Sequence, residues 1–216
     1  MSITTNIIKG TAKGVLSTIP GASILVSIAE EIHGGILQER FDDWKESVEL
    51  RLRMLTDMQL KQLPKNEIFA TVLLLSAQYA IKTNKAKRVY LANAVKSAAS
   101  TELPEERVVI LLGCFERYTI EHLRLLRFLY APTDYHPNDD IYMGSPISIY
   151  YEYYPERVKD LDGVIVRDLY NDGLINTNSL NATMTGRGCL EKRTTRLGDD
   201  MIKFFGIEHM VNIVWI

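Results

Sequence analysis

The sequence predicts a mainly α-helical protein in two parts, an N-terminal helical bundle over residues 1–117 and a smaller α+β domain over residues 118–216. Three observations indicate this fold class. Apolar residues recur at steps of three or four through the first part, as they do in amphipathic helices. The composition shifts near Tyr118, from Ala, Leu, Lys and Glu to Tyr, Pro, Gly, Asn and Thr. The second part also contains a segment in which a small β-hairpin fits between two helices.

The apolar periodicity of the first part predicts four or five packed helices. One apolar stripe runs up to Pro64, which is expected to stop its helix. Asn66 is a suitable N-cap for the next helix, which is apolar nearly all round and therefore belongs in the middle of a bundle. Two more helices are expected over residues 84–100 and 103–118. The stripe consists of Leu37, Phe41, Trp44, Val48, Leu52 and Leu55.

An uncharged segment, residues 14–29, precedes these helices. It is shorter than the roughly 20 apolar residues that a transmembrane helix needs, and Pro20 and Gly21 divide it. Residues 22–32 instead predict an amphipathic helix that packs on the bundle. A membrane surface or a partner protein is the alternative contact for the apolar face of this helix. That face is formed by Ile24, Leu25, Ile28 and Ile32.

The second part begins with a helix for which Thr119 is the expected N-cap and Pro132 the end. A Tyr- and Pro-rich insertion follows over residues 133–155, and connections of that length are typically functional or loosely ordered. Its tyrosines predict an interaction surface, or an extra strand because "ISIYYEY" alternates in polarity. The candidate interface residues are Tyr142, Tyr150, Tyr151, Tyr153 and Tyr154.

The remaining elements predict a second helix that ends at Gly173, two short strands joined by a turn, and a closing helix. The turn contains Gly186 and Gly188. This order resembles a winged-helix domain, and the resemblance covers roughly residues 118–207. The stretches that carry it are "LYNDGLIN" before the first strand and "TRLGDDMIKFF" after the second, with Thr195, Gly198 and Met201.

In DNA-binding winged-helix proteins the recognition helix would correspond to residues 155–172. Such a helix needs basic and amide side chains toward the bases and phosphates, whereas this one carries five acidic residues against three basic ones. The winged helix is therefore expected to bind or pack against protein, and DNA binding is the alternative. The possible phosphate contacts lie in the wing and are Arg187, Lys192, Arg193 and Arg196.

Three stretches define the overall plan of the chain. They are "STIPGASILVSIAEEIHGGILQERFDDW", "AKRVYLANAVKSA" and "YTIEHLRLLRFL". This plan resembles the Abi-alpha type of bacterial abortive-infection-like proteins, which begin with a glycine-containing apolar segment, continue with a helical bundle and end in a winged-helix-like unit. The resemblance implies a role in defence or stress and assigns no functional residue.

No catalytic set is recognisable in the sequence. Its four histidines form no His-Glu-x-x-His pattern, and Cys114 and Cys189 are far apart. Glu30 and His33 share a helix face but would need a second such pair to bind a metal, so no metal or cofactor is expected. Two isolated cysteines fit a reducing compartment, which favours a cytoplasmic location.

The sequence thus predicts a non-enzymatic bacterial or phage-related interaction protein that binds a protein partner or itself. Two alternatives stay open. One is a winged-helix transcriptional regulator that binds nucleic acid. The other is a membrane-active effector that uses residues 14–35. No small-molecule substrate is indicated.

Overall fold

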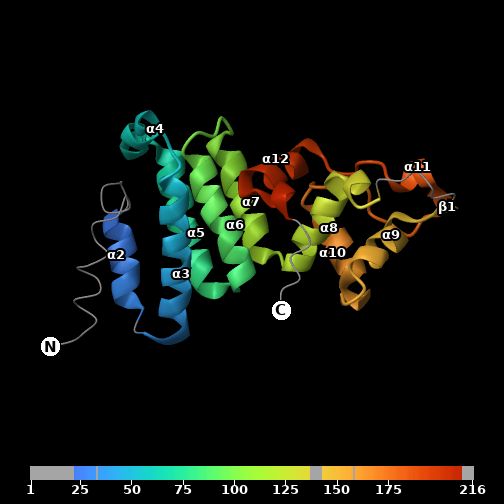
Figure 1. Cartoon of the computed structure of the whole chain (residues 1–216), viewed down its shortest axis with the longest axis horizontal. Helices are drawn as coiled ribbons and strands as arrows, with labels where there is room; N and C mark the ends of the chain where they lie inside the picture. Colours follow the sequence, from blue (N-terminus) through green and yellow to red (C-terminus); the bar gives the residue numbers. More distant parts are fainter. Residues whose placement is uncertain (1–21, 33, 137–142, 158, 211–216) are drawn as a thin grey trace. The chain divides into compact units, whose positions relative to one another are not determined.

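The computed structural model describes residues 22–32, 34–136, 143–157 and 159–210. The protein is mainly helical and contains a small antiparallel sheet of two strands (Figure 1). It forms two compact units, Met1–Glu116 and Arg117–Ile216. The division falls one residue before the boundary placed from the change in composition.

The N-terminal unit is a helical bundle in which α3 packs along α6, and α5 packs against both. The shorter α2 contacts α5. Large side chains from several helices meet in the interior, including Trp44, Phe69 and Leu91, which are fully buried. The elements are α2 (Ala22–Glu31), α3 (Gly35–Leu52), α4 (Asp57–Gln62), η2 (Leu63–Lys65), α5 (Glu67–Lys82), α6 (Lys85–Ala98) and α7 (Glu105–Arg117).

The prediction that one helix continues to Pro64 was wrong, because α3 ends at Leu52. Thr56 starts the separate helix α4, where its hydroxyl accepts a hydrogen bond from the Gln59 backbone and the Gln59 side chain accepts one from the Thr56 backbone. This reciprocal capping satisfies backbone donors that a continuous helix would have paired internally. The predicted cap at Asn66 is confirmed, since its side-chain oxygen accepts from the Phe69 backbone at 2.8 Å.

The C-terminal unit is built around three helices. Both α10 and α12 pack against α8, and Leu129, Leu169 and Phe205 are fully buried. Its elements are α8 (Ile120–Tyr130), η3 (Pro132–Asp134), β1 (Met143–Gly144), α9 (Pro146–Tyr153), η4 (Lys159–Leu161), α10 (Asp162–Asn171), β2 (Met184–Thr185), α11 (Gly186–Cys189), α12 (Arg196–Phe205) and η5 (Ile207–His209).

The predicted strand within the Tyr-rich insertion was wrong, because these residues form helix α9. Ser145 caps it by accepting a hydrogen bond from the Ser148 backbone, and Pro146 occupies the first turn, where its missing N–H costs nothing. Ile147 and Tyr150 lie three residues apart and are both buried. The residues whose alternation suggested a strand therefore also fit the spacing of a helix with one buried side.

The predicted hairpin is only partly present. Its two arms meet at a single antiparallel bridge between Ile175 and Thr194. Strand β2 pairs instead with β1 from the insertion, with Met143 opposite Thr185. The expected glycine turn is the short helix α11, which Thr185 caps by accepting a hydrogen bond from the Gly188 backbone.

Candidate interaction surface on helix α10

One side of α10 is buried and the other is open to solvent. Ile165, Val166 and Leu169 face the interior. The opposite side, which we call the α10 face, carries residues at helical spacings of three, four and seven, so they point the same way. The exposed residues of the α10 face are Gly163, Val164, Arg167, Tyr170 and Asn171.

The acidic residues of this segment are mostly engaged elsewhere. Asp162 pairs with Arg157, whose side chain is almost completely buried and stacks on the Tyr151 ring with 3.6 Å between the guanidinium carbon and the ring centre. Asp162 also accepts a hydrogen bond from the Tyr151 hydroxyl at 2.8 Å. This carboxylate is therefore part of the internal packing and does not belong to the α10 face.

Asp172 and Asp168 are paired with other residues of the C-terminal unit. Asp172 accepts two hydrogen bonds from Arg117 and one, of 2.6 Å, from the Tyr118 hydroxyl. Asp168 lies 3.6 Å from Nε2 of His122. The five acids that disfavoured a binding helix therefore do not all face outward, which the sequence alone could not reveal.

His122 links this region to the cap of α8. Its Nδ1 accepts a hydrogen bond from the Thr119 backbone at 3.2 Å, so the ring hydrogen of the neutral form lies on Nε2, toward Asp168. The ring also stacks on Tyr118, with 4.7 Å between ring centres. These contacts fix the helix that α10 packs against and hold the α10 face in place.

The four predicted phosphate contacts separate into two groups. Lys192 donates to Asp199 at 2.7 Å, and Arg193 donates to the Gly188 carbonyl at 2.7 Å. These two cations therefore support the fold of their own segment. Arg187 and Arg196 are exposed. Lys192 is exposed as well although it is paired, so Arg193 is the one half-buried residue of the predicted basic patch.

Among the tyrosines of the insertion that the structure describes, none is fully exposed. Tyr150 and Tyr154 are buried in an aromatic cluster with Phe128 and Tyr135, in which neighbouring ring centres lie 4.9 to 6.1 Å apart. The burial raises the pKa of the Tyr150 hydroxyl above its ordinary value. Tyr151 and Tyr153 are partly exposed, and Tyr142 lies outside the described residues.

The structure describes only part of the predicted apolar face of the first helix. Leu25 is buried, and Ile28 and Ile32 are half-buried, which agrees with packing on the bundle. The side chain of Ile24 and residues 14–21 lie outside the described part of the chain. Among the helices that the structure describes, none has the length and apolar character needed to cross a bilayer.

No metal site is formed within the described residues, where no three His, Cys, Asp or Glu side chains gather closely enough to hold an ion. The sequence analysis did not predict the α10 face. The helical spacing of its residues was recognisable, but the five acidic residues of the segment argued against a binding surface.

Comparison of the chain with protein-family models, curated proteins and solved structures gives no match.

Proposed function

We propose that this chain is a non-enzymatic interaction protein that associates with a second copy of itself through the α10 face of a winged-helix-like unit. The order of α8, α9, α10, two bridged arms and α12 supports that arrangement. In it, α10 takes the place of the recognition helix. The Abi-alpha resemblance suggests a defence or stress context for such an assembly.

The observation that carries the proposal is the chemistry of the α10 face. It combines an apolar Val164 and an aromatic Tyr170 with the guanidinium of Arg167. Tyrosine and arginine dominate the energetically important positions of protein interfaces. Residues 117–216 contain eleven Lys and Arg against fourteen Asp and Glu, a net charge of −3. A unit with that charge is poorly suited to a nucleic-acid backbone.

The α10 face is complementary to itself. Two antiparallel copies related by a twofold axis between residues 165 and 166 place Val164 opposite Arg167, and Asp160 opposite Asn171. Arg167 then lies about one helical turn from Asp160 of the partner subunit, which gives two opposite-charge contacts for each pair of helices. A ten-residue helix is small for an interface, so we expect a weak dimer.

Size-exclusion chromatography with light scattering tests the proposal. The wild-type mass should rise from the 24.6 kDa of one chain toward twice that value as concentration passes through the micromolar range. Val164→Glu should keep the protein monomeric. The matched control is Val109→Glu on α7, because Val109 and Val164 are similarly exposed, at 43% and 39%. A wild-type chain that stays monomeric, or equal effects of both variants, overturns the proposal.

Charge reversal gives a second, independent test. Arg167→Asp and Asp160→Arg should each weaken the dimer, because each places like charges opposite one another. The double variant restores opposite charges in the reverse order and should dimerise again. Failure of this rescue, while both variants remain folded by circular dichroism, would rule out the antiparallel arrangement.

Nucleic-acid binding is the second candidate, since Arg167 and Asn171 are residue types that read base edges and Arg187 and Arg196 are exposed nearby in sequence. Fluorescence anisotropy with a labelled DNA duplex at low salt tests it. Binding that disappears in an Arg187→Gln/Arg196→Gln variant would support this function. Absence of binding at low salt removes it.

A further inference from the structure

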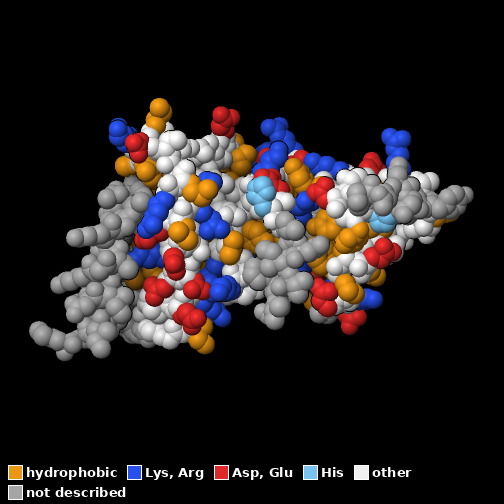
Figure 2. Space-filling view, in the orientation of Figure 1, with side chains coloured by type: hydrophobic (Ala, Val, Ile, Leu, Met, Phe, Trp, Pro, Cys, Tyr) orange, Lys and Arg blue, Asp and Glu red, His pale blue; other side chains and the backbone are white. Residues whose placement is uncertain are grey.

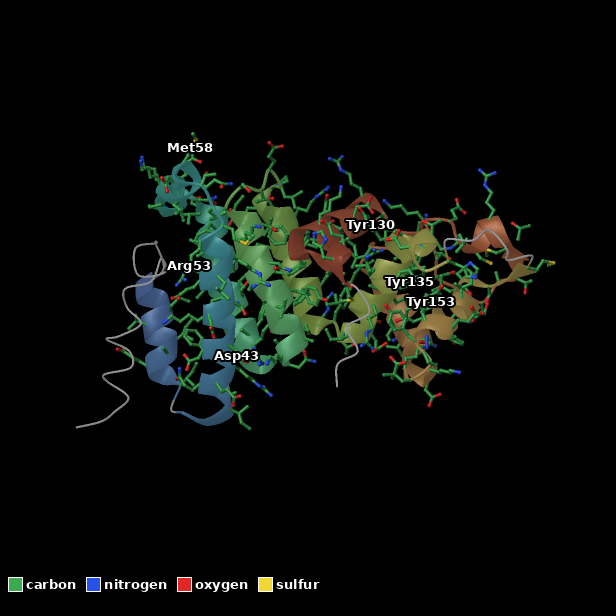
Figure 3. All side chains as sticks on the ribbon, in the orientation of Figure 1. Asp43, Arg53, Met58, Tyr130, Tyr135 and Tyr153 are labelled. Atoms are coloured by element: carbon green, nitrogen blue, oxygen red, sulfur yellow. The ribbon has the colours of Figure 1, made fainter. Side chains whose placement is uncertain are left out.

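A second exposed surface lies at the α3–α4 corner of the N-terminal unit. Helix α4 has no buried residue, and Figure 3 shows Met58 pointing outward from it. Met58 is 71% exposed, Met54 is 69% exposed, and Leu50 on the last turns of α3 is 55% exposed. Large apolar side chains so open to water at one corner of a folded unit indicate a contact site.

Both ends of α4 are held by local contacts despite the exposure of the helix. The reciprocal cap between Thr56 and Gln59 defines the start of α4. Leu63, directly after α4, is fully buried and anchors the helix to the bundle. Met58 is thus carried on a short helix with a fixed beginning and a fixed end, which reduces the entropy lost when it makes a contact.

Basic side chains lie close to the methionines in the sequence. Lys61 and Lys65 follow Met58 at helical spacing and line an open surface hollow of about 640 Å³, which Glu67 and Glu105 also line. Arg53, the residue before Met54, is exposed, and α4 itself carries one acidic residue, Asp57. Figure 2 shows hydrophobic and basic side chains next to each other over α4, together with an acidic group. We define the α4 tip as Leu50, Arg53, Met54, Met58, Lys61 and Lys65.

We propose that the α4 tip docks the protein onto an anionic membrane surface. Met54 and Met58 enter the boundary between headgroups and acyl chains, while Arg53, Lys61 and Lys65 contact lipid phosphates. Short amphipathic segments bind in this way, with apolar side chains inserted and basic ones at headgroup level. Each Lys or Arg near an anionic leaflet adds to the attraction, and combining charge with insertion is what stabilises binding.

The shape of the tip favours a membrane over an acidic peptide. An amphipathic peptide needs an apolar groove, whereas the hollow beside α4 is lined by Ile68 as its one apolar side chain and otherwise by polar or charged groups. Met54 and Met58 are exposed and are not among the residues that line the hollow. The proposal rests on residues 50–65 and does not depend on self-association or on residues 14–35.

Vesicle flotation with the full-length protein tests the proposal. The wild type should float with vesicles that contain equal amounts of phosphatidylglycerol and phosphatidylcholine, and at least tenfold less with phosphatidylcholine alone. Met54→Asp/Met58→Asp should lower binding to the anionic vesicles at least tenfold. Val109→Asp/Ile110→Asp is the matched control, because it adds the same charge at two exposed apolar residues of α7 and should change binding less than twofold.

The charged residues are tested separately. Lys61→Gln/Lys65→Gln should weaken binding to anionic vesicles several-fold and reduce its dependence on salt, without changing the thermal unfolding temperature by more than a degree or so. Three results would overturn the proposal. They are a wild type that does not float, a methionine variant that floats like the wild type, and a chain that ignores vesicles but is retained on polyaspartate beads. The last result assigns the tip to an acidic polypeptide.

Discussion

The backbone of Gly198 lies directly against the carbonyl oxygen of Leu174. A Cβ atom at position 198 would stand 2.1 Å from that oxygen. The same carbonyl accepts a hydrogen bond of 2.9 Å from the Thr195 backbone. Thr195 also donates through its hydroxyl to the Gly173 carbonyl at 2.6 Å. The start of α12 is therefore locked to the turn that follows α10, and only glycine fits at position 198.

Gly198→Ala should lower the free energy of unfolding of the C-terminal unit by about 3 kcal/mol, because the new methyl group overlaps a backbone atom that cannot rotate away. Urea denaturation followed by circular dichroism measures this. Gly163→Ala is the control, since a Cβ there meets no atom within 4 Å and α10 has helical geometry. That variant should be stabilised by roughly 0.5 to 1 kcal/mol. Equal effects at the two glycines would contradict the packing described.

The ion pair between Arg88 and Asp43 predicts unequal costs for its two partners. Arg88 is buried, with its Nη2 2.8 Å from the Asp43 carboxylate and its Nη1 donating to the Thr83 carbonyl at 2.9 Å. Asp43, labelled in Figure 3, is 40% exposed. Asp43→Ala leaves a buried cation without its counter-charge and should cost about 2 kcal/mol. Arg88→Met removes the cation and should cost about 1 kcal/mol or less.

The control for this pair is Asp42→Ala on the same helix. Asp42 is exposed and accepts a hydrogen bond from Gln38 one turn earlier. Its replacement should change the free energy of unfolding by no more than about 0.5 kcal/mol. If Arg88→Met proved more damaging than Asp43→Ala, the attraction between the two groups would outweigh the burial of the charge, and the expectation would fail.

Helix caps were predictable from the sequence because each depends on a few consecutive residues. Asn66 and Thr119 both begin the helices assigned to them. The break between α3 and α4 was missed although Thr56 and Gln59 carry a local capping signal. There the apolar stripe continued through the break, and periodicity alone does not distinguish one helix from two.

The candidate surface was less predictable, because it depends on contacts between distant residues. Five acids in one segment look like one negative face. Only the folded chain shows that Asp162 lies against Arg157 and that Asp172 lies against Arg117. In the same way, five tyrosines suggested a surface, whereas the packing of α9 buries Tyr150 and Tyr154. Pairing and burial of this kind are properties of the tertiary structure.

Lys87 predicts a pH dependence of stability. Its amine donates to the Phe115 and Glu116 carbonyls at 2.7 and 3.2 Å. Burial lowers the pKa of this amine from 10.5 to about 8, and the nearby Glu116 charge opposes the shift. Between these two pH values the unfolded chain binds more protons at Lys87 than the folded chain does. Stability therefore rises with pH across this window.

Comparison with Lys87→Met isolates the effect, since other titrating groups are common to both proteins. The wild type should gain stability relative to the variant from about pH 8 to 10.5, with a slope on the order of 1 kcal/mol per pH unit. Urea unfolding at several pH values measures it. Lys82→Met, which removes an exposed amine 3.5 Å from Glu116, is the matched control. A gain in stability toward low pH would contradict the assignment.

The aromatic cluster predicts opposite effects for two adjacent tyrosine hydroxyls. In the part of the chain that the structure describes, the Tyr150 hydroxyl is buried without a hydrogen-bond partner. The Tyr154 hydroxyl donates to that of Tyr135 at 3.3 Å. An unpaired buried hydroxyl destabilises the fold, so Tyr150→Phe should leave stability unchanged or raise it by up to about 1 kcal/mol.

Tyr154→Phe instead removes a hydrogen bond and leaves the buried Tyr135 hydroxyl without it. This change should lower the free energy of unfolding by about 1 kcal/mol. Both substitutions delete one hydroxyl oxygen from neighbouring rings of the same aromatic cluster, so they control for each other in one series of urea titrations. A loss of stability in Tyr150→Phe equal to that in Tyr154→Phe would mean that the Tyr150 hydroxyl is hydrogen-bonded in solution, most simply to a buried water molecule.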